Sequence, residues 1–203
     1  MLPITTLAPT VSPIPTSLKV TDAVGDVRDE AGRKGSKLAY LDITSMAAHT
    51  GADSFYPGDH IYLDVWVAAT PPAVDPLRET ISFSWLLDTN VDGNPDWEVS
   101  IQSDDLSESN GYSAWTSSLW SLSDNQVRYG GEVTVDGNHV GIRIDAGRIH
   151  GPARVGIAGA TESAIWADPV NDPLNVTIRH DNLPDSQWPD GANWLLLTTG
   201  YGR

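Results

Sequence analysis

Oxygen-bearing side chains recur at close spacing in one short segment near the middle of the chain. From Asp88 to Asp96 they occupy relative positions 1, 3, 5 and 9, with Gly93 at position 6. Calcium takes about six to eight oxygen ligands, and a tight loop with alternate side chains turned inward supplies several of them. The spacing therefore predicts a calcium site, and the alternative is an Asp/Asn/Gly turn without metal. The predicted ligands are Asp88, Asn90, Asp92, Asn94 and Asp96.

This loop differs from the EF-hand, the best-known calcium loop. An EF-hand needs a bidentate glutamate at position 12, but Val99 stands there and Glu98 lies one place early. The loop also lies between two strand-like runs and not between two helices. We therefore predict a calcium ion that fastens a connection between strands and has a structural role.

Two further acidic groups lie near the ends of the folded region. Asp22 and Asp26 flank a glycine-containing turn near the first predicted strand, and an acidic run that starts at Asp181 continues through Asp185 and Asp190. If the terminal strands are neighbours, Asp22, Asp26, Asp185 and Asp190 form a second, weaker metal site. Solvated turns are the alternative interpretation of these residues.

Strand-like alternation surrounds these loops. In residues 60–67 every second residue is aliphatic, and the same period appears in residues 80–87 and 97–101. Residues 132–145 predict a hairpin whose turn centres on Asp136-Gly137 or on Gly137-Asn138. Further strands are predicted at 38–44, 112–122, 154–158, 176–179 and 194–199. About eight to ten short strands and no long helix predict an all-β protein, a two-sheet antiparallel β-sandwich of the jelly-roll kind.

The N-terminal segment differs in composition from the rest of the chain. Residues 1–17 contain four prolines among Thr, Ser and small apolar residues, and they carry no charged side chain. We expect a linker or tether there, a disordered tail, or a segment that pairs with a sheet edge. Residues 18–203 form the predicted sandwich domain. No basic and apolar leader follows Met1, so an exported protein would have this sequence as its mature form.

Several motifs occur in an order that resembles a known group of proteins. They are Asp22 to Asp26, Tyr40-Leu41-Asp42-Ile43-Thr44, Pro57-Gly58-Asp59, Leu87 to Gly93, and Leu183-Pro184-Asp185. Over residues 18–192 the chain resembles extracellular β-sandwich modules of the DOMON-like and family 9 carbohydrate-binding type. The resemblance implies a jelly-roll-like sandwich, structural calcium and ligand binding on a sheet face or in loops. It identifies no haem-ligating pair in this chain.

Eight tryptophans provide candidates for a sugar-binding surface. Trp85 and Trp97 share the aliphatic faces of their strands and are predicted to be core residues. Aromatic rings pack against the C–H faces of sugars when they are exposed. Trp115 and Trp120 differ by an odd number, so in a regular strand they face opposite ways. The predicted ligand-binding residues are Tyr62, Trp66, Trp120 and Trp188.

The charge balance excludes some partners. The chain has 12 Lys and Arg against 27 Asp and Glu, a net charge of −15. Such a surface repels phosphate backbones and anionic lipids, so we expect neither nucleic-acid binding nor membrane insertion. The chain has no cysteine, and it lacks a metal-type histidine spacing, a nucleophile elbow and a phosphate loop. We therefore expect no enzyme activity.

These observations give three hypotheses of function. The first is a non-catalytic, calcium-stabilised extracellular or cell-surface module that binds a polysaccharide or cell-surface glycan. The second is a structural cell-surface or filament subunit that binds copies of itself or a larger assembly through its N-terminal segment. The third is a glycan-active enzyme, which requires two carboxylates facing each other across a cleft.

Overall fold

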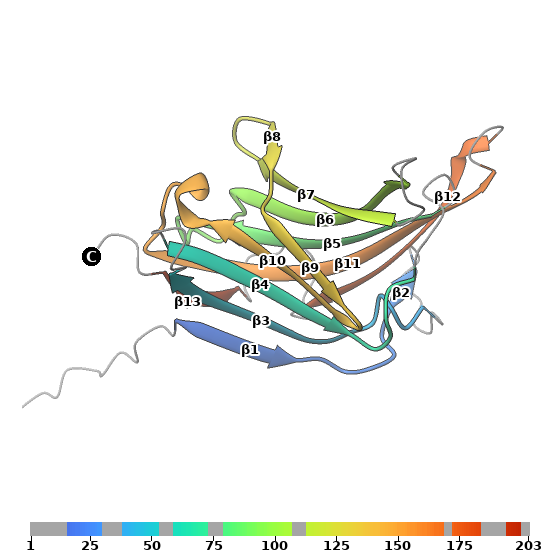
Figure 1. Ribbon diagram of the computed structural model, residues 1–203, viewed down its shortest axis with the longest axis horizontal. Helices are drawn as coiled ribbons and strands as arrows, with labels where there is room; N and C mark the ends of the chain where they lie inside the picture. Colours follow the sequence, from blue (N-terminus) through green and yellow to red (C-terminus); the bar gives the residue numbers. More distant parts are fainter. Residues whose placement is uncertain are drawn as a thin grey trace, which may run out of the picture.

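The computed structural model describes residues 16–29, 38–52, 59–72, 79–106, 113–168, 172–183 and 194–199. Two antiparallel β-sheets stack face to face, with the five-stranded sheet in front in Figure 1. The prediction of an all-β, two-sheet antiparallel sandwich is confirmed. The described residues contain one short 3-10 helix, η1 (Ala146–Ile149), and none of their helices is long and apolar enough to cross a membrane.

The smaller sheet has five strands in the order β1-β3-β4-β10-β9. Their bounds are β1 (Ser17–Thr21), β3 (Ile43–Ala52), β4 (Asp59–Val67), β10 (His139–Asp145) and β9 (Glu132–Asp136). The β9–β10 hairpin pairs Asp136 with His139, so the two-residue turn centres on Gly137-Asn138. Ser17 already belongs to β1, and the predicted linker otherwise lies almost wholly outside the described residues.

The larger sheet has seven strands in the order β2-β12-β11-β5-β6-β7-β8, and an eighth, β13, pairs with β11. Their bounds are β2 (Arg28–Asp29), β12 (Asp172–Leu183), β11 (Arg154–Asp168), β5 (Glu79–Asp88), β6 (Trp97–Leu106), β7 (Ser113–Ser121), β8 (Gln126–Tyr129) and β13 (Leu195–Thr198). Short strands such as β2 and β8 bring the described total to thirteen.

The core fills the space between the sheets. The aliphatic face of β4, from Ile61 to Val67, is buried against the inner face of the larger sheet, where Phe83, Trp85 and Trp97 are also buried. Trp85 and Trp97 are therefore core residues, as predicted. Period-2 alternation places these side chains on one face of each strand, and burying that face is the main driving force for the sandwich.

One predicted strand begins later than expected. Residues 38–44 were predicted to be extended, but residues 38–42 form a turn in which the Leu41 amide donates to the Leu38 carbonyl, 2.9 Å away. β3 then begins at Ile43. Leu41 is buried because the turn folds back onto the core. A buried apolar residue at this position is also what a strand would show, so the sequence pattern did not distinguish the turn from a strand.

Candidate functional site

The loop from Asp88 to Asp96 connects β5 to β6 and is organised around Asp88. The Asp88 carboxylate is buried and accepts three backbone amides: Oδ1 from Val91 at 2.7 Å and Asp92 at 3.2 Å, and Oδ2 from Gly93 at 2.8 Å. Val91 and Gly93 have positive φ angles of 60° and 94°, which turn these amides toward the carboxylate. Asp88 therefore closes the loop from within.

The other oxygen-bearing residues of this loop also bind its backbone. Oδ1 of Asn90 accepts from the Asp92 amide, and Oδ1 of Asp92 accepts from the Asn94 amide, each at 2.9 Å. Oδ2 of Asp96 accepts from both the amide and the hydroxyl of Thr89. The bond from the Asn94 amide lowers the pKa of Asp92 below its ordinary value and keeps this carboxyl ionised. A calcium ion in this loop remains a prediction.

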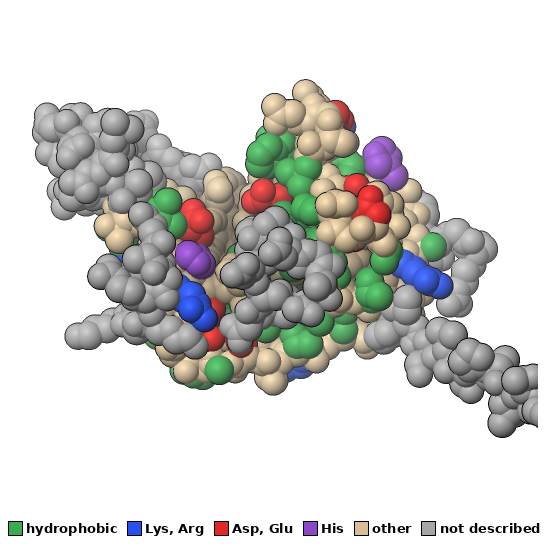
Figure 2. All heavy atoms as spheres, turned by 180° about the vertical axis from the view of Figure 1, so that it is seen from behind, with side chains coloured by type: hydrophobic (Ala, Val, Ile, Leu, Met, Phe, Trp, Pro, Cys, Tyr) green, Lys and Arg blue, Asp and Glu red, His purple; other side chains and the backbone are tan. Residues whose placement is uncertain are grey.

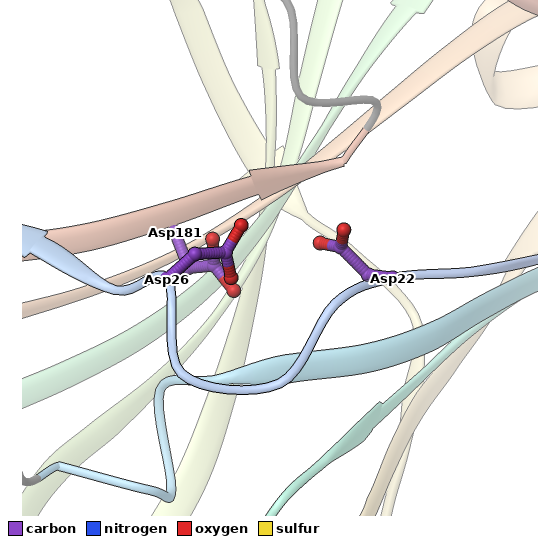
Figure 3. Close-up of side chains that lie close together, drawn as sticks. All are labelled: Asp22, Asp26 and Asp181. Carbon is purple, nitrogen blue, oxygen red and sulfur yellow. The ribbon is translucent and has the colours of Figure 1, made fainter. Parts of the chain in front are cut away.

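A group of carboxylates lies where the two sheets meet. Among the described residues, one set of at least three Asp, Glu or His side chains has its ligand atoms within 4.8 Å of one another: Asp22, Asp26 and Asp181. Asp22 and Asp26 flank the turn between β1 and β2, and Asp181 lies on β12 (Figure 3). We call this set the acidic cluster.

The acidic cluster contains two of the four residues predicted to form a second metal site. Asp22 and Asp26 do meet the acidic segment near the other end of the chain, because β2 pairs with β12. The predicted ligands Asp185 and Asp190 lie outside the described residues, and Asp181, the first acid of the same run, occupies the position beside Asp22 and Asp26.

Burial makes it energetically costly to keep all three carboxylates of the acidic cluster ionised. Asp26 and Asp181 are each only 4% exposed. Burial, the largest cause, and the nearby Asp26 and Asp22 carboxylates together raise the pKa of Asp181 to about 7, and the hydrogen bond from the Ile43 amide opposes this rise. Three carboxylates held this close repel one another, and a bound divalent cation would remove the repulsion.

Asp42 adds a fourth carboxylate next to the acidic cluster. Its Oδ2 accepts from the Gly25 amide at 2.7 Å, and Gly25 precedes Asp26 in the turn. Its Oδ1 is buried and has no hydrogen-bond partner among the described residues. An all-oxygen donor set with an unsatisfied buried oxygen beside it fits a hard cation such as Ca²⁺. The sequence placed Asp42 only within the motifs of the resemblance and not among the ligands.

The aromatic residues predicted to bind ligand on β4 lie on the outer face of the smaller sheet. The Tyr62 ring stacks on His49 at 4.4 Å between centroids, and the Trp66 ring stacks on His139 at 4.8 Å. The ammonium group of Lys19 lies 4.7 Å from the Trp66 ring centroid. Both rings are half-buried, and neighbouring side chains of the same sheet already cover them.

The other predicted aromatic candidates separate in the structure. Trp120 is 37% exposed on the outer face of the larger sheet, whereas Trp115 packs against the core near Phe83. The odd spacing of these two tryptophans thus gives opposite faces, as predicted. Trp188 lies outside the described residues.

A groove on the outer face of the larger sheet was missed by the sequence analysis. It has a volume of about 430 Å³ and is lined from β5, β6, β11 and β12. Its lining residues are Ser82, Ser84, Glu98, Gln102, Ala160, Thr161, Glu162, His180 and Asn182. The signal in the sequence was the small polar residues Ser82 and Ser84, which alternate with the apolar residues of β5.

We found no protein-family model, no curated protein and no solved structure that matches this chain. The resemblance to DOMON-like and family 9 carbohydrate-binding modules therefore stays a prediction.

Proposed function

We propose that this protein is a non-catalytic, calcium-stabilised binding module that acts outside the cell or at its surface, with carbohydrate as its ligand. The observation that carries the calcium part is the acidic cluster of Asp22, Asp26 and Asp181, whose ligand atoms lie within 4.8 Å of one another. The cluster joins the end of β1 in one sheet to β12 in the other. An ion there would cross-link the sandwich.

The chemistry of the acidic cluster favours calcium over transition metals. Its donors are carboxylate oxygens, which suit Ca²⁺ and Mg²⁺, and it contains neither histidine nor cysteine, the ligands that zinc prefers. Two carboxylates from a turn and one from a strand give the irregular ligand set that calcium tolerates better than magnesium does. The Asp88–Asp96 loop is proposed as a second calcium site on the spacing of its oxygens.

The carbohydrate part of the proposal rests on the character of the outer surface. A net charge of −15 disfavours anionic ligands, and the groove of the larger sheet is lined almost wholly by polar side chains. Uncharged, hydroxyl-rich ligands are compatible with both facts. The resemblance to extracellular carbohydrate-binding modules points to the same ligand class and location.

Calcium binding is tested by thermal unfolding with and without the ion. EDTA should lower the melting temperature by several degrees and added calcium should restore it, because an ion that binds only the folded state stabilises it. Asp26→Asn should reduce this calcium response. Asp136→Asn on the exposed edge strand β9 is the matched control and should keep it. Equal melting curves in EDTA and calcium, with no metal in elemental analysis, would disprove the calcium proposal.

A second candidate function is a glycan-active enzyme. It is favoured by one observation: Glu98 and Glu162 line the same groove. Glycosidases use two carboxyl groups at a sugar-binding cleft. Release of reducing ends from an oligosaccharide by the wild-type protein, and its loss in Glu162→Gln, would establish the enzyme and replace the binding module.

A further inference from the structure

The groove owes its shape to small side chains at the centre of the larger sheet. Ser84 pairs across the strands with Ala160, and Ala160 pairs with Asn182. Ser82 likewise pairs with Glu162, which pairs with His180. Because directly opposed residues lie on the same face of an antiparallel sheet, the short side chains of β5 and β11 form a floor and the longer ones form walls.

The walls of the groove are polar and acidic. Glu98 accepts a 3.3 Å hydrogen bond from the Ser84 hydroxyl, and burial raises its pKa, opposed by that bond and assisted by the nearby Glu162 carboxylate. Gln102 and Asn182 add amide groups that both donate and accept. Figure 2 shows the molecule from behind, where acidic and histidine side chains are exposed together with hydrophobic ones.

An aromatic ring stands beside the groove. Trp120 on β7 is the cross-strand partner of Glu98 on β6, so both side chains emerge on the same face. Trp120 is 37% exposed, and its Nε1 donates to Oδ1 of Asn125 at 3.1 Å, which orients the ring. A fixed, partly exposed ring next to a row of hydrogen-bonding groups is suited to a ligand with one apolar face and polar edges.

We propose that this groove is the recognition site and that it binds a neutral sugar unit of a polysaccharide. The Glu98 and Glu162 carboxylates accept hydrogen bonds from sugar hydroxyls, and Gln102 and Asn182 bond to others. Trp120 packs against the C–H face of the adjacent sugar. The two carboxylates repel uronic acids and other anionic sugars. This inference rests on the proposed function for the class of ligand, and it adds the location and the preference for uncharged sugars.

The outer face of the smaller sheet fits this role less well. The Tyr62 and Trp66 rings there are stacked on His49 and His139, so a sugar would first have to displace an intramolecular partner. Within the part of the chain that the structure describes, the groove leaves a volume of about 430 Å³ above its floor of Ser82, Ser84 and Ala160.

The test is a titration of the calcium-loaded protein with neutral oligosaccharides (β-glucan, xylan and mannan fragments) and with a uronic-acid oligosaccharide. The wild-type protein should bind a neutral oligosaccharide and not the uronic acid. Glu162→Gln removes a charged acceptor, and Ser84→Trp fills the floor. Each should weaken binding about tenfold or more, about 1.4 kcal/mol for each factor of ten. The matched control, Asp136→Asn, should bind as the wild type does.

The outcomes separate this inference from the proposed function. If the wild type binds a neutral sugar and both groove variants bind it equally well, the groove is not the site, while the carbohydrate-binding function stands. If the wild type binds none of these sugars, the carbohydrate function and the groove assignment both fail. Because Ser84→Trp alters packing, Glu162→Gln on its exposed position decides the result if the larger variant does not fold.

Discussion

The Ile43 amide donates a 2.7 Å hydrogen bond to Oδ2 of Asp181, a residue 138 positions further along the chain. The bond joins the first residue of β3 in the smaller sheet to β12 in the larger sheet. Asp42, the residue before Ile43, accepts from the Gly25 amide in the turn that carries Asp26. Two consecutive residues thus attach both halves of the acidic cluster to the start of one strand.

Asp181 should make the calcium-free protein less stable as the pH rises. Its pKa in the folded state is about 7, above the ordinary 3.8, so the folded state holds this proton more tightly than the unfolded state does. The resulting stability is fully present below about pH 4 and is lost as the pH rises from there to about 7; the part lost above pH 5 is about 1–3 kcal/mol after allowance for solvent screening. Denaturant unfolding in EDTA at pH 5 and pH 8 measures it. The pH dependence should be smaller in Asp181→Asn, and an identical dependence in both proteins would contradict the assignment.

The Asp88–Asp96 loop should show two different mutational responses. Asp88→Ala removes an acceptor of three partly exposed backbone amides of the loop and should cost about 1–3 kcal/mol in both calcium and EDTA. Asp92→Ala should lower the melting temperature in calcium by several degrees, as EDTA does to the wild type, and change it little in EDTA. The same loss in both conditions for Asp92→Ala would show that its role is in the turn and not in metal binding.

Thr161 should contribute to holding the larger sheet against the turn before β3. Its side chain is fully buried, and its hydroxyl donates to the Leu41 carbonyl at 2.5 Å. Thr161→Val keeps the shape but removes this donor, so we expect a loss of about 1–3 kcal/mol in the free energy of unfolding. Thr134→Val on exposed β9 is the matched control and should change stability by less than about 0.5 kcal/mol.

Trp66 should be a stabilising residue of the smaller sheet. Trp66→Ala removes the stacking on His139 and the contact with Lys19, and should cost about 1–2 kcal/mol. Binding of a neutral sugar should stay unchanged, because the groove lies on the other sheet. Chemical denaturation and the sugar titration together check this prediction. Loss of sugar binding in a folded Trp66→Ala protein would move recognition to the smaller sheet.

The sequence by itself determined the fold class and which faces of the strands are buried. Apolar residues alternate with other residues at a period of two in residues 60–67 and 80–87. This pattern indicates a β-strand with one face in the core, because successive side chains of a strand point to opposite faces. The same alternation identified Trp85 and Trp97 as core residues and predicted opposite faces for Trp115 and Trp120. It misplaced the start of β3, since the turn at residues 38–42 buries Leu41 as a strand would.

The tertiary structure alone decided which distant residues meet. Asp22 and Asp26 were recognisable as acidic turn residues, but their partner Asp181 depends on the pairing of β2 with β12, which local spacing does not encode. The groove likewise needs the register of four strands, because Ser84 and Ala160 make a floor only when they lie directly opposite each other. The spacing of apolar residues along the chain indicates on which face of a strand a side chain lies. The pairing and register of the strands determine which side chains of other strands lie next to it on that face.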